Sequence, residues 1–276
     1  MAQNQVAVKG NVNVSIKEKK EPFWSKIDNR VMVTISLLFG VLLWYLLSKI
    51  PSIGVILVGP DKVFSAGIVE IRSGRLLNNI GISLFRVMSG YILAFIVAVP
   101  VAFLMGWYSL IKSLIEPWIQ FFRTIPPIAL IPLVIVAMGI GEGAKTAIIF
   151  LCSFLVMVIS IYQGVCNVDT TLIKAARVLG AKERNIFFDI VVPASFPYIL
   201  VALRLGISTA MTTLVAAELT GASSGLGNMI QEAALYFQMD VILLGIFTIG
   251  ILGFAFDKII LFAERKLTAW QDTRRS

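Results

Sequence analysis

The sequence predicts an all-α, polytopic membrane protein with about six transmembrane helices. Hydrophobic residues make up 58% of the 276 residues and charged residues only 14%, which leaves too little charge for the surface of a soluble protein. Six apolar runs are also long enough for helices that cross a hydrocarbon layer of ~30 Å, which takes about 20 residues. These runs are 31–48, 87–110, 124–141, 146–168, 190–217 and 241–256.

The six runs form one membrane domain, because no hydrophilic stretch is long enough to fold separately. We divide the chain into an amino-terminal tail (1–30), a transmembrane domain (31–265) that contains one polar loop (169–193), and a carboxyl-terminal tail (266–276). The first run is expected to be a retained helix and not a secretory signal. It begins only at Val31, is long enough to span, and lacks a small-residue cleavage site after it.

Basic residues predict the orientation in the membrane. They gather in the amino-terminal tail, in the polar loop and near the carboxyl terminus, whereas the opposite face holds Lys62, Arg72, Arg75 and Lys145. The positive-inside rule therefore places both termini and the polar loop in the cytoplasm. This bias also accounts for the net charge of +8, and because the basic residues are dispersed among the loops we expect no nucleic-acid binding.

Missing residue types exclude several enzyme classes. The sequence has no histidine, which excludes His-based acid/base catalysis, Ser-His triads and His-containing zinc sites. Cys152 and Cys166 are separated by about 21 Å of rise in one predicted helix, so they cannot pair and are interpreted as structural thiols, with no metal site. Residues 139–146 nearly match a phosphate-binding loop. Ala144 replaces its second glycine, and the stretch joins two membrane runs, so we interpret it as a turn.

The polar loop contains the segment KAARVLGAKERNIFFDIVVP (174–193). Asp169 and the threonines after it offer helix-capping side chains, and apolar residues recur at helical spacing from Leu172 to Leu179. Gly180 suits the left-handed end of a helix. We expect a short amphipathic helix outside the bilayer, which lies either in the lipid interface or in a groove of another protein.

The spacing within this loop resembles a motif of ABC importer permease subunits: Glu-Ala-Ala, three residues, Gly, nine residues, then Ile-x-Leu-Pro. This chain has Ala175-Ala176, Gly180, Ile190 and Pro193 at the matching positions, with Lys174 in place of glutamate and Val192 in place of leucine. The resemblance implies that the short helix is a coupling helix docked in a cleft of a separate ATPase subunit. The implied coupling residues are Lys174, Ala175, Ala176, Arg177, Leu179, Gly180 and Pro193.

The resemblance extends from about Leu57 to Trp270. Phrases such as RTIPPIALIPL (123–133), VAAEL (215–219) and GLG (225–227) are similar to permeases for taurine, aliphatic sulfonates, nitrate or bicarbonate, and taurine and sulfonate permeases look closest. The resemblance implies the type I ABC importer permease fold, in the bacterial plasma (inner) membrane, and a small anion as substrate. It also implies a homodimer, an extracytoplasmic solute-binding protein, and two ATP-binding cassette subunits that hold the ATP and Mg²⁺, with no cofactor in this chain.

Polar residues within the membrane runs are candidates for a translocation path. A charge at membrane depth costs at least about 2.5 kcal/mol unless it faces protein or water, so we expect Arg204 to interrupt the fifth run and Glu218 to close it beside a polar passage. Alternatively, Arg204 reaches the headgroups and nearby hydroxyls bond their own helix. Arg86 and Arg123 either attract an anion or anchor at the interface, and the prolines of the third run either free carbonyls along a cavity or kink the helix. The candidates are Arg86, Arg123, Pro126, Pro127, Arg204, Ser208, Thr212, Thr213 and Glu218.

Two other classes are open to a chain of this composition. An ATP-independent secondary transporter or channel for small anions would be favoured by inverted repeats and by ionisable residues within several helices, and neither is evident. A membrane-embedded enzyme would need convergent polar groups at one depth, which the membrane runs lack. We therefore expect a transport subunit that makes and breaks no covalent bond.

Overall fold

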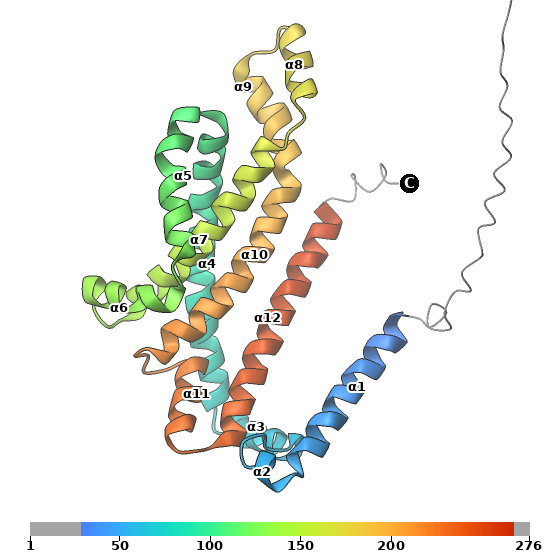
Figure 1. Cartoon of the computed structure of the whole chain (residues 1–276), viewed down its shortest axis with the longest axis vertical. Coiled ribbons are helices and arrows are strands. Elements are labelled where there is room, and N and C mark those ends of the chain that lie inside the picture. The colour runs from blue at the N-terminus through green and yellow to red at the C-terminus, as the bar shows by residue number, and fades with distance from the viewer. Residues whose placement is uncertain (1–28, 268–276) are drawn as a thin grey trace, which may run out of the picture.

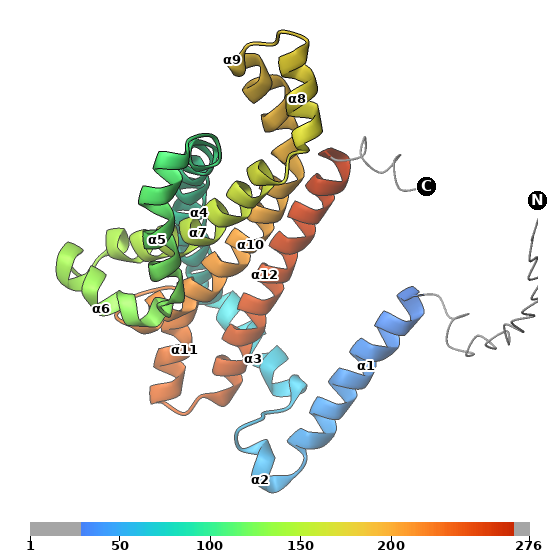
Figure 2. The same ribbon diagram turned by 45° about the horizontal axis from the view of Figure 1, so that its top comes forward.

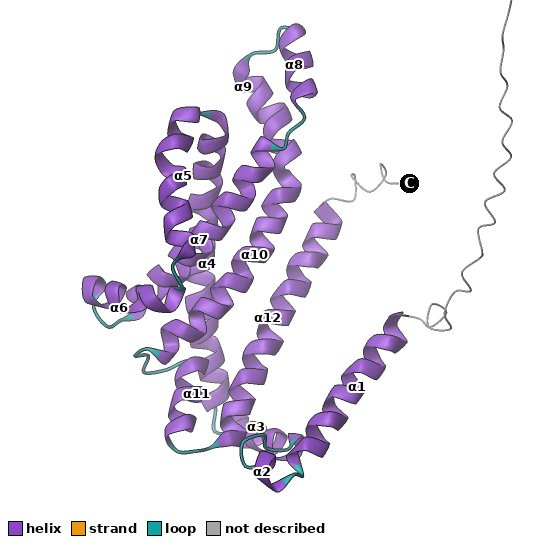
Figure 3. Ribbon diagram, in the orientation of Figure 1, coloured by secondary structure: helices purple, strands orange, loops and turns teal. Residues whose placement is uncertain are grey.

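The computed structural model describes residues 29–267, and these residues form helices joined by short connections, without strands (Figures 1 and 3). The predicted all-α class is confirmed. The predicted tails lie almost wholly outside the described residues. The elements are α1 (Asn29–Ser48), α2 (Pro51–Gly54), α3 (Pro60–Arg72), α4 (Arg75–Trp107), α5 (Ser109–Thr124), α6 (Pro127–Met138), α7 (Glu142–Cys166), α8 (Thr170–Val178), α9 (Glu183–Asn185), the π-helix η2 (Ile186–Val191), α10 (Val192–Leu219), α11 (Leu226–Leu235) and α12 (Met239–Leu267).

The core of the fold is α7, which packs along both α4 and α10. Small residues let these helices approach closely. A Cβ atom added to Gly206 of α10 would lie 2.1 Å from the side chain of Met157 in α7, and one added to Gly90 of α4 would lie 2.7 Å from Ile149. Because lipid tails are as apolar as the helices, such close packing of small residues is a main source of helix association in membranes.

Within residues 29–267, five helical segments are long and apolar enough to cross a membrane, and α5 with α6 makes a sixth if that bent pair is one span. The predicted third span, 124–141, is wrong in its bounds. Helix α5 occupies Ser109–Thr124, α6 occupies Pro127–Met138, and the chain turns by 107° between them, at the prolines that were expected to disturb this run. A residue that precedes proline is driven out of the helical region. Ile125 and Pro126 each precede a proline and both have extended ψ angles, which ends α5.

The fifth span agrees with the predicted run 190–217, in which Arg204 interrupts the apolar sequence. Helix α10 continues without a break from Val192 to Leu219, preceded directly by α9 and η2. Its backbone hydrogen bonds are internal to the helix, so a charged side chain leaves them intact. A charged side chain at membrane depth therefore affects which face of the helix can lie against lipid. It does not affect whether the helix forms.

The bundle has two ends, which Figures 1 and 2 both show. The α8 end, at the top of Figure 1, carries α8, α9 and the α4–α5 connection. The α11 end, at the bottom, carries α2, α3 and α11. The first helix, α1, stands apart from the bundle and is exposed along its length, and near its end Trp44 stacks on Phe247 of α12 and donates a hydrogen bond to the carbonyl of Val58.

Candidate functional site: the polar loop and the charged clusters

The polar loop at the α8 end folds as a helical hairpin. Asp169 caps α8 by accepting a hydrogen bond from the backbone N–H of Thr171 at 2.8 Å, and this bond holds the pKa of Asp169 below its ordinary value. At the other end Gly180 has a φ of 80°, and its N–H donates to the carbonyl of Arg177 while Ala181 N–H donates to the carbonyl of Ala176. These two bonds form the Schellman motif that often ends a helix at glycine. The short helix predicted from the sequence is therefore present, with Gly180 at its end.

The hairpin is closed by an ion pair that the sequence analysis did not find. Arg177 donates two hydrogen bonds to Glu183, at 2.9 and 3.1 Å. This contact joins the end of α8 to the start of α9 across the glycine turn, and both side chains are more than half exposed. The sequence did contain a signal for this pair: two opposite charges six residues apart, on either side of the glycine that ends the helix. The pair lies across the outside of the hairpin, where solvent weakens its contribution to stability.

The surface of the hairpin is left open. Val178 and Leu179 are 88% and 85% exposed, and Leu172, Lys174 and Ala175 are also exposed, whereas Ala176 is half-buried. Pro193 lies at the second position of α10, directly after the π-helix η2. The predicted coupling residues are thus brought together on one projecting element, except Pro193, which lies at the start of α10.

The α11 end contains a buried charged cluster. The Arg86 side chain of α4 is fully buried, and its Nη1 lies 2.6 Å from Oε1 of Glu218, which is also fully buried at the end of α10. Nε and Nη2 of Arg86 contact the carboxylate of Glu142 at the start of α7, and Lys145 lies 3.0 Å from the same carboxylate. Two positive charges are matched by two negative ones. The structure therefore places Arg86 and Glu218, both predicted on a path, in a network that joins α4, α7 and α10. This network is buried at Arg86 and Glu218 and reaches the surface at Glu142, whose side chain is 54% exposed.

The same cluster holds the loop between α10 and α11. Ser83 donates to Glu218 and accepts from the N–H of Leu226, Gly227 N–H donates to Glu218, and Gly225 N–H donates to Asn79. Gly225 has a φ of 113°, and a Cβ there would lie 2.2 Å from Glu218 Oε1. The contributions of Asn79, Ser83 and Glu142 were missed in the sequence, because their partners lie far along the chain.

The near-match to a phosphate-binding loop is a turn, as interpreted. Gly139 and Gly141 flank the end of α6 and the start of α7, and no strand precedes them within residues 29–267. Lys145 is paired with Glu142. The stretch therefore connects two helices and contributes Glu142 to the charged cluster.

The polar residues of α10 divide between two faces. Thr213 is buried, beside Cys152 of α7. Arg204, Ser208 and Thr212 follow one another at intervals of four residues and are exposed. The hydroxyls of Ser208 and Thr212 donate to carbonyls of the preceding turn, as one sequence-based alternative expected. Their exposed face nevertheless forms a polar row on one side of α10.

Arg123, Pro126 and Pro127 lie at the bend between α5 and α6. Arg123 and Pro126 are exposed, and the bend leaves the last carbonyls of α5 without helical partners. Among residues 29–267, Arg123 forms no ion pair. It belongs to α5, whereas the polar row belongs to α10.

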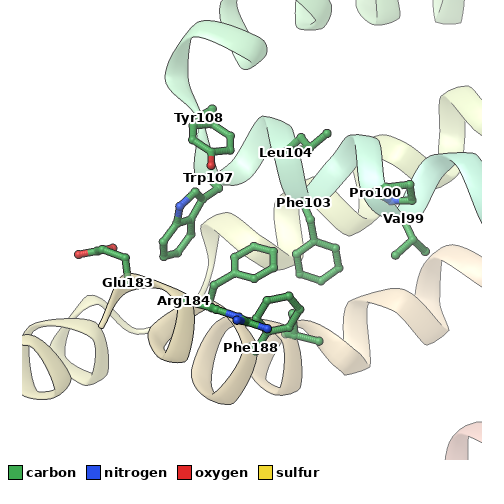
Figure 4. Close-up of a pocket in the computed structure, with 11 residues that line it drawn as sticks. Val99, Pro100, Phe103, Leu104, Trp107, Tyr108, Glu183, Arg184 and Phe188 are labelled. Atoms are coloured by element: carbon green, nitrogen blue, oxygen red, sulfur yellow. The ribbon is translucent and has the colours of Figure 1, made fainter. Parts of the chain in front are cut away.

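A cavity of about 630 Å³ lies at the α8 end between α4 and the segment formed by α9 and η2 (Figure 4). Its lining is mostly apolar and includes Phe103, Trp107, Phe187 and Phe188, with the Arg184 guanidinium 6.0 Å from the ring centre of Phe188. Figure 4 shows Phe103 and Trp107 on one side of the cavity and Phe188 on the other. An apolar lining of this kind does not suit a permeating anion.

Comparisons with known proteins identify the family. A model described as "Binding-protein-dependent transport system inner membrane component" matches residues 90–269. A probable ABC transporter permease protein of Brucella abortus (strain 2308) is 50% identical over 238 residues, 86% of this chain and 94% of that protein. The taurine transport system permease protein TauC of Escherichia coli (strain K12) is 30% identical over 266 residues, 94% of this chain and 97% of that protein.

The fold has solved counterparts. The crystal structure of an amino acid ABC transporter with histidines contains a chain that superposes with a TM-score of 0.61 at 17% identity, covering 73% of this chain and 97% of that one. The predicted type I ABC importer permease fold is thereby confirmed. With this fold, the helical hairpin and the matching family model, the chain belongs to the family of inner-membrane permease subunits of binding-protein-dependent ABC transporters.

Proposed function

We propose that this chain is the permease subunit of an ATP-driven importer for a small monovalent anion, with taurine or another aliphatic sulfonate first and nitrate or bicarbonate second. The observation that carries the proposal is the similarity to a taurine permease along nearly the whole of both chains. One scaffold can serve several substrates, so the similarity supports a class of substrate. A measurement of uptake identifies the substrate within that class.

In this proposal the α8 end is cytoplasmic, and α8 docks into a cleft of the ATPase subunit. The exposed apolar side chains of Val178 and Leu179 support docking, because they project from the hairpin and nothing within residues 29–267 covers them. The functional unit is a permease homodimer with two ATP-binding cassette subunits, which hold the ATP and Mg²⁺. A solute-binding protein delivers the anion to the α11 end.

We assign the translocation path to the exposed polar row of α10, formed by Arg204, Ser208 and Thr212. Exposed polar groups along a membrane helix are costly against lipid and stable beside water or protein. We assign the bend between α5 and α6 to the same path, because the chain changes direction there by 107°. The residues of the bend are Arg123, Pro126 and Pro127. Thr213, Arg86 and Glu218 are buried within the subunit, and we assign them to holding its helices together.

Uptake by the reconstituted permease, ATPase and binding protein tests this function. Proteoliposomes that contain ATP should accumulate labelled taurine in preference to nitrate and bicarbonate, and the accumulation should stop when the ATPase subunit is inactivated. A sugar, which has no anionic group, and a monovalent cation serve as control solutes. Uptake only of solutes that have no anionic group would remove the assignment, and uptake of an anionic solute or taurine that is indifferent to ATP would favour a secondary transporter or channel.

A further inference from the structure

One charged pair within the spans is neither buried nor at a helix end. Arg204 of α10 donates two hydrogen bonds to Asp257 of α12, from Nε to Oδ1 at 2.5 Å and from Nη2 to Oδ2 at 3.3 Å. The side chains are 45% and 26% exposed. In contrast to the enclosed Arg86–Glu218 pair, this pair presents much of its surface to whatever lies beside α10 and α12.

The pair lies toward the α8 end of the spans. Arg204 is about 22 Å along α10 from Leu219, and Asp257 is about 27 Å along α12 from Met239, at 1.5 Å per residue. A hydrocarbon layer is ~30 Å thick. Measured from the α11 end, Arg204 therefore lies within such a layer and Asp257 lies close to its α8 boundary, and half-exposed charges there need water or protein beside them.

The neighbouring surfaces show on which side that water or protein lies. The exposed large residues of α12 around Asp257 are the apolar Ile251, Phe254, Ile259 and Phe262, which suit lipid, and Lys258, whose long side chain can reach the headgroups. On α10, Ser208 and Thr212 continue from Arg204 as a row of hydroxyls about 12 Å long. The two helices run side by side in both views (Figures 1 and 2), and the Arg204–Asp257 pair lies where they meet.

We propose that Asp257 is the resting counter-ion of Arg204, and that the anionic group of the substrate takes its place during transport. This inference rests on the proposed anion path along α10. In the empty path the Asp257 carboxylate satisfies the guanidinium. When the substrate passes, its single negative charge, as a sulfonate, nitrate or bicarbonate, accepts the same two N–H groups and Asp257 turns away.

The exchange explains why a monovalent anion suits this site. A guanidinium presents two parallel N–H donors that match a planar or tetrahedral oxyanion as well as a carboxylate. Without Asp257, the guanidinium would keep only the weaker influence of Glu264 and would bind the anion too well to release it. With Asp257, capture and release are close in free energy, since conduction requires binding that is weak enough to reverse.

Substitution of Asp257 tests the exchange by separating affinity from rate. In Asp257→Asn the anion no longer competes with a carboxylate, so the KM for uptake should fall by about tenfold or more and the maximal rate should fall as well. In Arg204→Gln the KM should rise. Asp257→Glu keeps the counter-ion and should keep both parameters near wild type.

Lys258→Gln is the matched control, because it removes a charge from the next residue of α12. The Nζ atom of Lys258 lies 5.0 Å from the ring centre of Phe254, and the ion pair with Arg204 is made by Asp257. Its KM should equal that of wild type. An unchanged or raised KM in Asp257→Asn would overturn the inference, because a purely structural pair predicts loss of protein or rate without tighter binding.

A second measurement covers the case in which Asp257→Asn does not assemble. In a chain with Cys152 and Cys166 replaced by serine, Ser208→Cys should react with a charged thiol reagent, and saturating substrate should slow this reaction several-fold. Failure of substrate to protect Ser208→Cys would overturn the inference while wild-type uptake still supported the proposed function. If the wild-type assembly moves no anion, the proposed function fails and the inference fails with it.

Discussion

At the α11 end Arg86 and Glu218 are enclosed completely, whereas at the α8 end Arg177 and Glu183 form an ion pair in the open. Breaking a buried pair leaves an uncompensated charge and costs about 3–5 kcal/mol, while exposed pairs contribute little to stability. The α11 end is therefore held by charge. The α8 hairpin is held by its backbone, through the Asp169 cap and the Gly180 turn, which leaves its surface available for a partner.

The largest effect is expected from removal of the buried charge. Arg86→Met should lower the free energy of unfolding by about 3–5 kcal/mol, because Glu218 would stay buried without its cation. Thermal unfolding of the detergent-purified protein measures this. Glu232→Gln is the control at the same end, since its pair with Arg75 is exposed and should be worth about 1 kcal/mol or less. Equal effects of the two substitutions would contradict the comparison.

An intermediate effect is expected at the glycine turn, on coupling more than on stability. Gly180→Val places a β-branched residue at a φ of 80°, which costs at least about 1–2 kcal/mol and should deform the hairpin. Co-purification of the ATPase subunit and ATP-driven uptake should both fall, while the permease still inserts. Gly180→Asn should retain both, because asparagine tolerates the left-handed conformation. If valine and asparagine behave alike, the shape of this turn is not what the ATPase recognises.

The smallest effect concerns the cap of α8 and depends on pH. The folded-state pKa of Asp169 is lowered by the Thr171 N–H, so its stabilisation is present above the unfolded-state pKa and is lost as pH falls through the folded-state pKa. Hydrogen exchange of the Thr171 amide, corrected for its intrinsic rate, should accelerate over that acidic range. Asp169→Asn keeps a neutral acceptor and should show no such pH dependence, and Asp169→Ala should exchange fast throughout. A pH-dependent Asn variant would show that another group controls this helix end.

The sequence predicted best where the determining signal is local. The Asp169 cap, the spacing of apolar residues and Gly180 are neighbours in the chain, and they correctly predicted α8 and its end. Span lengths also follow from local hydropathy, which explains why most of the six runs correspond to helices. Pro126 and Pro127 also indicated a bend in the sequence. The apolar run around them does not indicate the direction in which the chain turns there.

The charged clusters could not be predicted in this way. Arg86 and Glu218 are 132 residues apart, and Arg204 and Asp257 are 53 apart, so their pairing depends on how α4, α10 and α12 pack. The sequence showed that each charge needed a partner or water and left both alternatives open. Only the fold separates Arg86, which is enclosed, from Arg204, which is half exposed.

The unbroken helical segment from Glu183 to Leu219 has a mechanical consequence. Its 37 residues extend for about 55 Å, with the α8 hairpin at one end and the Glu218 anchor at the other. If a stiff rod of that length tilts by about 5° about its anchored end, its free end moves by about 5 Å. A point along the rod moves in proportion to its distance from the anchored end. Arg204 lies about two fifths of the way from the anchor. A displacement of the hairpin by a partner would therefore reach Arg204 as a shift of about 2 Å, enough to break or remake a hydrogen bond.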